Sequence, residues 1–213
     1  MIVSLSEQKK SDENMKQITF EQYRSLDLMI WTVITVVFEA ITTLATNKWV
    51  YAQPVAMSIT LTLICITMMR WNTYAEIPAV AGGFIFSLVS GATFEQYIIY
   101  CIGNVFALAA FLIIKMYNKE ILRGSAVKLS LFVITAYIGM SLGRWLVSLF
   151  FRGDLMAFVV YITTDIISLL FAVIIMNLLR KTDGMIEDQK AYLFRVQEEE
   201  EENYYEEDGG ILL

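Results

Sequence analysis

The sequence predicts an all-α, polytopic membrane protein that folds as a bundle of six transmembrane helices. Six apolar stretches each come close to the roughly 20 residues that a helix needs to cross the hydrocarbon core of a bilayer. Charged residues make up only 18% of the chain and lie mostly outside these stretches, whereas a soluble bundle places charges along one face of every helix. The alternating segments of about ten residues that are typical of a membrane β-barrel do not occur. The predicted spans are Leu26–Thr46, Pro54–Arg70, Tyr74–Ser90, Phe94–Met116, Ala126–Phe151 and Leu155–Arg180.

The segments before and between the apolar stretches support the predicted boundaries of the spans. Residues 1–25 are polar and lack the basic, apolar and small pattern of a cleavable signal, so we expect the first span to be retained. Three linkers are so short that the helices on either side must be antiparallel neighbours: Arg70–Thr73, Gly91–Thr93 and Arg152–Asp154. The chain therefore divides into a cytosolic segment 1–25, a six-helix membrane domain 26–181 and a cytosolic extension 182–213.

The C-terminal extension contains two different patterns. Residues 183–197 mix apolar and charged side chains, which is typical either of an interfacial or partner-facing helix or of an ordinary cytosolic extension. The following Glu198–Glu202 run predicts a solvated, disordered acidic tail. A docking arm for a basic cytosolic partner is the alternative for this tail.

Lysine and arginine residues indicate the orientation. With alternating spans, the side opposite to the termini carries only Lys48 and Arg152, and Arg144 lies within the fifth span. This asymmetry predicts that both termini are cytoplasmic. The basic residues on the terminal side are Lys9, Lys10, Lys16, Arg24, Arg70, Lys115, Lys119, Arg123, Lys128, Arg180, Lys181, Lys190 and Arg195.

Absent residue types and motifs exclude several functions. The chain has no histidine, which excludes Ser-His and Cys-His catalysis and most zinc or haem ligation by imidazole. It contains no GxxxxGK[ST] motif, which would bind ATP phosphates. Asp165 is the one aspartate well inside a span, which argues against a membrane protease with two catalytic aspartates. Cys65 and Cys101 lie in apolar spans and predict buried thiols. We therefore expect no enzyme activity, no cofactor, no metal site and no nucleic-acid partner.

Polar residues inside the spans are the candidate site, because charges in hydrocarbon are costly. Glu39, Asn104, Arg144 and Asp165 all fall in or near the predicted outer half of the membrane. Gln96, Tyr100 and Asn104 recur at intervals of four residues and so share one helical face. This pattern favours a polar cavity, open to the outside, for a small polar and partly aromatic solute.

Structural roles are the alternatives for these residues. Arg144 and Asp165 could simply neutralise one another between adjacent helices, and the Gln96, Tyr100 and Asn104 stripe could join two helices. Glu39 could equally bond a neighbouring helix, contact a partner or contact substrate. Gly139 and Gly143 form a GxxxG motif, which predicts close helix packing within the chain, or a surface for another membrane subunit.

The chain resembles the substrate-binding S component of energy-coupling factor (ECF) vitamin transporters. The similarity is carried by Arg70-Trp71, Pro78-Ala79, Gly82-Gly83, Ser90-Gly91-Ala92, Glu95-Gln96-Tyr97, Tyr100, Gly103-Asn104, Gly143-Arg144 and Asp165, and it covers most of Trp31–Arg195. The AxxxA pattern that commonly meets the coupling subunit is not matched on the first helix, where Ala40 and Ala45 are five apart and Thr42 and Thr46 are the small pair at the right spacing.

The resemblance implies a multi-pass protein of the bacterial plasma membrane that captures a vitamin or similar micronutrient outside. A membrane coupling subunit and cytosolic ATPase subunits would then drive uptake. The resemblance makes Gln96, Tyr100, Asn104, Arg144 and Asp165 the candidate substrate-binding residues. An autonomous small-solute channel or facilitator and a membrane scaffold protein are the alternatives.

Overall fold

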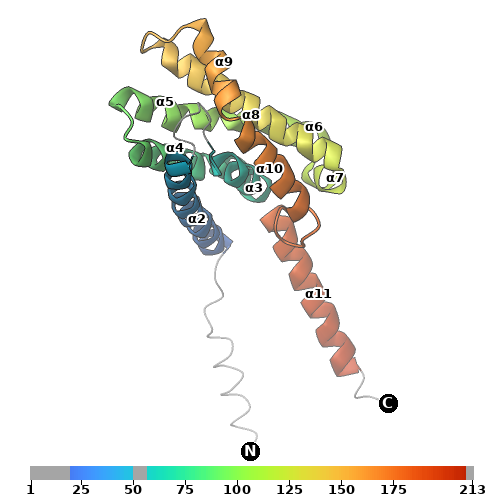
Figure 1. Cartoon of the computed structure of the whole chain (residues 1–213). Helices are drawn as coiled ribbons and strands as arrows, with labels where there is room; N and C mark the ends of the chain where they lie inside the picture. The colour runs from blue at the N-terminus through green and yellow to red at the C-terminus, as the bar shows by residue number, and fades with distance from the viewer. Residues whose placement is uncertain (1–19, 50–56, 210–213) are drawn as a thin grey trace, which may run out of the picture.

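The computed structural model describes residues 20–49 and 57–209, with side chains for residues 20–48 and 57–199, and every element in these ranges is a helix (Figure 1). The α-helices are α2 (Phe20–Trp49), α3 (Thr60–Trp71), α4 (Glu76–Ser90), α5 (Phe94–Val105), α6 (Phe111–Tyr117), α7 (Lys119–Gly124), α8 (Ala126–Leu149), α9 (Leu155–Thr164), α10 (Ile166–Leu179) and α11 (Gln189–Gly209). Two short 3₁₀ helices, η1 (Asn72–Ala75) and η2 (Phe106–Ala110), link α3 to α4 and α5 to α6. The all-α prediction is thus confirmed for the described residues.

The long apolar helices indicate a multi-pass membrane protein. Within the described residues, four helical stretches are long and apolar enough to cross a bilayer, and a fifth is added if α9 and α10 form one span bent by 46°. The six-span count is therefore not confirmed. The four stretches are Phe20–Lys48, Thr60–Ser90, Phe94–Tyr117 and Ala126–Leu149.

The predicted second and third spans are antiparallel neighbours, as their short linker implied, but by length and composition the stretch Thr60–Ser90 counts as one candidate span rather than two. The backbone turns at Asn72, which has a φ of 56°, and α4 then folds back along α3. A Cβ atom on Gly82 would lie 2.2 Å from the Thr60 hydroxyl oxygen, so the middle of α4 contacts the start of α3. The 12 residues of α3 and the 15 of α4 measure only about 18 and 22 Å. Each helix is thus shorter than the roughly 30 Å hydrocarbon core.

Helix α3 is the centre of the bundle. All twelve of its residues, Thr60–Trp71, are buried, and α2, α4, α8 and α10 pack around it. Its apolar side chains share one core with Phe132 and Met140 of α8 and with Met176 of α10. A helix that is surrounded on all sides explains why residues 60–69 carry no charged side chain.

The GxxxG motif packs inside the chain. A Cβ atom on Gly139 would lie 2.5 Å from the carbonyl oxygen of Phe106, and one on Gly143 would lie 2.4 Å from the Phe106 Cβ atom. The two glycines therefore let α8 approach η2 and the end of α5. This confirms the predicted packing role within the chain.

Large apolar side chains cover the outside of the bundle. Met29 of α2 is 64% exposed, Leu155 of α9 is 76% exposed and Leu178 of α10 is 64% exposed. Such a continuous apolar exterior would be unfavourable in water and suits contact with lipid acyl chains.

The first turns of α2 and α11 lie at the same end of the bundle, where the Tyr23 hydroxyl donates to the Gln189 Oε1 atom at 3.1 Å. From there α11 extends away from the other helices (Figure 1). The acidic run Glu198–Glu202, predicted to be disordered, continues α11 as helix. Glutamate is a good helix former, and Arg195 pairs with Glu199 one turn on, at 3.8 Å.

Residues 1–19, 50–56 and 210–213, which include Pro54 and most of the predicted segment 1–25, lie outside the described residues.

Substitution of Gly143 by alanine should destabilise the protein, because the new methyl group would overlap Phe106 and the Gly103 carbonyl oxygen. We expect a loss of about 1–3 kcal/mol of unfolding free energy, typical of overpacking. Unfolding in detergent would measure it. Gly124→Ala is the matched control, since no heavy atom lies within 4 Å of a Cβ atom there. Equal stability of the two variants would contradict the packing role.

Candidate functional site

Arg144 is the centre of a buried polar cluster. The residue is only 3% exposed, and its Nε atom donates to the Asn104 Oδ1 atom at 3.0 Å. Its Nη1 atom pairs with the Asp165 carboxylate, and its Nη2 atom contacts the Met140 sulfur at 3.6 Å. The guanidinium carbon also lies 4.8 Å from the centre of the Tyr100 ring, a cation–π contact. We call Tyr100, Asn104, Arg144 and Asp165 the Arg144 cluster.

The cluster joins four parts of the bundle. Asn104 uses its amide nitrogen to donate to the Ala79 carbonyl oxygen of α4 at 3.2 Å, while its oxygen accepts from Arg144 of α8. A Cβ atom on the preceding Gly103 would lie 2.5 Å from the Arg144 Cγ atom. The missing side chain at position 103 therefore gives Arg144 the room to reach α5.

Asp165 occupies the break between α9 and α10, where the helix axis bends by 46°. Its carboxylate pairs with Arg144 on one side of this break. On the other side, the Tyr137 hydroxyl of α8 donates to the Ile162 carbonyl oxygen of α9. The bent segment is thus tied to α8 by one ion pair and one hydrogen bond to the backbone. None of the α9 residues is fully buried.

Gln96 lies apart from the other predicted site residues. Its side chain is exposed, and its Oε1 atom accepts from the Thr93 backbone N–H at 2.9 Å in the capping box at the start of α5. Four of the five predicted residues therefore converge, and Gln96 satisfies a helix end. Tyr100 is additionally packed against Phe86 and Tyr161, with ring centres 4.7 and 6.4 Å away.

Glu39 performs a different task. Its Oε2 atom accepts from the backbone N–H groups of Ile59 and Thr60 at 3.0 Å, and from the hydroxyls of Ser58 and Thr60 at 2.9 and 2.8 Å. The fully buried carboxylate of α2 therefore caps the N-terminus of α3, where the helix dipole favours negative charge. Of the alternatives for Glu39, the structure shows the bond to a neighbouring helix.

Asp27 is a half-buried partner that was not among the predicted site residues. Its carboxylate accepts from Arg70 at 2.9 and 2.7 Å and from the Trp71 indole nitrogen. Arg70 also donates to the carbonyl oxygens of Gly184 and Met185 at 2.6 and 3.1 Å. The signal was available, because antiparallel spans place Asp27 near the same membrane face as Arg70.

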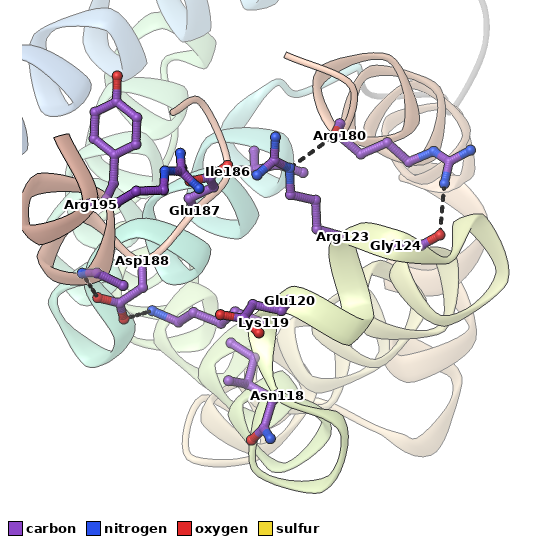
Figure 2. Close-up of a pocket in the computed structure, with 13 residues that line it drawn as sticks. Asn118, Lys119, Glu120, Arg123, Gly124, Arg180, Ile186, Glu187, Asp188 and Arg195 are labelled. Atoms are coloured by element: carbon purple, nitrogen blue, oxygen red, sulfur yellow. Dashed lines mark hydrogen bonds and ion pairs between the residues drawn. The ribbon is translucent and has the colours of Figure 1, made fainter. Parts of the chain in front are cut away.

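A cavity of about 870 Å³ is lined by residues of α6, α7, the segment between α10 and α11, and the start of α11 (Figure 2). Its charged walls are largely paired: Lys119 with Asp188 at 2.7 Å, and Arg123 and Arg195 with Glu187. Burial lowers the pKa of the Lys119 ammonium, and Asp188 offsets part of that effect. These pairs fasten α11 to the bundle.

The Arg144 cluster can hold an anionic or hydrogen-bonding group of a ligand. A guanidinium presents several N–H donors and stacks on aromatic rings, and Tyr100 and Asn104 add an aromatic face and an amide beside it. In the described structure these donors are engaged by Asp165, Asn104 and Met140. A ligand at Arg144 would therefore replace a contact that already exists. Among the described residues, no three histidine, cysteine, aspartate or glutamate side chains come close enough to hold a metal ion.

No protein-family model, curated protein or solved structure matches the chain.

Replacing Glu39 by leucine should strongly destabilise the bundle, because Ser58, Thr60 and two backbone N–H groups would lose a buried acceptor. We expect a loss of about 3 kcal/mol or more, since each buried unsatisfied group costs about 1–3 kcal/mol. Thermal unfolding in detergent would measure the change, and Glu39→Gln, which keeps one oxygen, should lose less.

Thr42→Val is a control on the same helix, because the Thr42 hydroxyl bonds only to the Phe38 carbonyl within α2. If Glu39→Leu were no less stable than Thr42→Val, the capping role of Glu39 would be wrong.

Proposed function

We propose that the chain is the substrate-binding membrane subunit of an ECF-type importer, which captures a vitamin-like micronutrient at the outer face of a bacterial plasma membrane. Both termini would then be cytoplasmic. The chain would perform no catalysis itself, and a membrane coupling subunit with cytosolic ATPase subunits would drive uptake.

The observation that carries the proposal is the convergence of Tyr100, Asn104 and Asp165 on one buried arginine. A charge inside an apolar bundle is costly and usually functional. These residues come from α5, α8 and the α9–α10 break, that is, from the same part of the chain that carries the resemblance to the S-component family.

The cluster favours a small solute with an anionic or carbonyl group and an aromatic part. Such a solute would place its acceptor at Arg144 in exchange for Asp165 and stack against Tyr100. Because α9 has no fully buried residue and is joined to α10 at the bend, movement of this segment is the least costly way to open the cluster.

A membrane scaffold protein is the second candidate, and a specific observation favours it. Every member of the Arg144 cluster already has a partner in the described structure, so the cluster could simply fasten α5, α8 and α10 together. A channel is less favoured, because it would need polar side chains through both halves of the membrane, and the sequence places few ionisable residues in the inner halves of the predicted spans.

The double substitution Arg144→Gln with Asp165→Asn tests the proposal. It removes both charges together and so leaves no uncompensated buried ion, whereas loss of one partner alone costs about 3–5 kcal/mol. We expect the purified variant to remain folded while its affinity for the solute falls about 10- to 100-fold, because a hydrogen bond to a charged group contributes about 1.5–3 kcal/mol. Mass spectrometry of small molecules retained by the wild-type protein would first identify the solute.

A second buried pair provides the control. Asp27→Asn with Arg70→Gln neutralises the largely buried ion pair at the C-terminal end of α3 and should leave solute affinity unchanged. Undiminished binding in the Arg144 and Asp165 double variant would refute the capture role. Co-purification with ATPase subunits would separate an importer subunit from a channel, and a wild-type chain that retains no solute would favour the scaffold.

A further inference from the structure

A groove of about 480 Å³ runs along α2 where it faces η1 and the start of α4. Its walls are mostly apolar, with Leu28, Met29 and Val33 of α2 on one side and Ile77 of α4 on the other. Met29 and Val33 are also 64% and 51% exposed, so the groove opens onto the apolar exterior of the bundle. The groove is separate from the Arg144 cluster and shares no residue with it.

One end of the groove is positively charged. Arg24 is the one charged residue that lines it, and its guanidinium carbon lies 4.7 Å from the centre of the Tyr74 ring. No described aspartate or glutamate forms an ion pair with Arg24. The neighbouring Ser25 also lines the groove. An arginine without a carboxylate partner retains donors for a phosphate.

The position of the groove matches the depth of a lipid. Arg24 lies four residues from the start of the apolar stretch Phe20–Lys48, and Val33 lies nine residues further along α2, about 14 Å deeper. Tyr74 and Ile77 lie at the turn of the α3–α4 hairpin, at the same end of the bundle as Asp27 and Arg70. The charged end is therefore at headgroup level and the apolar part at acyl-chain level.

We infer that this groove is a binding site for one anionic phospholipid, with the phosphate at Arg24 and one acyl chain along Leu28, Met29, Val33 and Ile77. The single positive charge complements the single negative charge of a phosphodiester, and the apolar walls complement the chain. The inference is independent of the proposed transport function.

Native mass spectrometry of the full-length protein would test the site with phosphatidylglycerol and phosphatidylcholine of identical acyl chains. We expect one phosphatidylglycerol to bind with about fivefold preference over phosphatidylcholine, the effect of one basic residue near the membrane surface. Arg24→Gln should abolish that preference. Lys48→Gln, which changes an exposed basic residue near the opposite end of α2, should retain it.

A bulky side chain introduced into the groove tests whether the lipid occupies it. Thr32 lines the groove, so Thr32→Phe should reduce binding of both lipids, whereas Thr42→Phe, further along α2 and outside the groove, should not. Equal binding of the two lipids to the wild-type protein, an unchanged preference in Arg24→Gln or unchanged binding in Thr32→Phe would each overturn the site. Binding of glycerol 3-phosphate at the same affinity would show a phosphate site without a lipid and would also overturn it.

Discussion

Enclosure of α3 is the constraint on which the rest of the bundle depends. A helix whose twelve residues are all buried cannot leave its ends to water, so its polar ends need partners from neighbouring helices. Both come from α2: Glu39 caps the N-terminus, and Asp27 binds Arg70 and Trp71 at the C-terminus. The two acids are 12 positions apart, about 18 Å along a helix, which equals the length of α3. Their spacing fixes the register of the antiparallel pair, and the α4 hairpin and α10 then pack around it.

Hydropathy predicted the membrane class and the positions of α2, α5–α6 and α8, because each is a continuous stretch longer than a bilayer requires. The short Arg70–Thr73 linker predicted the antiparallel pair that α3 and α4 form. Hydropathy could not predict that both helices are short, since two short apolar helices joined by a turn have the same average hydropathy as two full spans. Convergence of Asn104, Arg144 and Asp165 followed from their matching depths. Gln96 does not join that group, because its side-chain amide caps the exposed start of its own helix. Residue spacing alone does not reveal this local contact.

Glu39 and Asp165 are both buried acids, but they are stabilised by different kinds of partner. Glu39 accepts several hydrogen bonds from a helix end and needs no cation, so its contacts are local and fixed. Asp165 faces Arg144, and each depends on the other to compensate a buried charge. A ligand anion could take the place of Asp165 at Arg144, but nothing comparable could replace Glu39 without uncapping α3. Under the proposed function, exchange with a ligand would therefore be confined to the Arg144 cluster.

The position of Asp165 also decides which part of the bundle can respond to such an exchange. Helix α10 buries Ser168, Ala172 and Met176 against the core, whereas α9 buries no residue completely. A change at the break between them therefore meets less resistance on the α9 side. Described contacts hold α9 to α8 through the Tyr137 hydrogen bond to the Ile162 carbonyl and the ring contact between Trp145 and Phe158. Breaking the Arg144–Asp165 pair would thus leave α9 held by these remaining contacts, while the contacts of α3 with Glu39 and Asp27 stay in place.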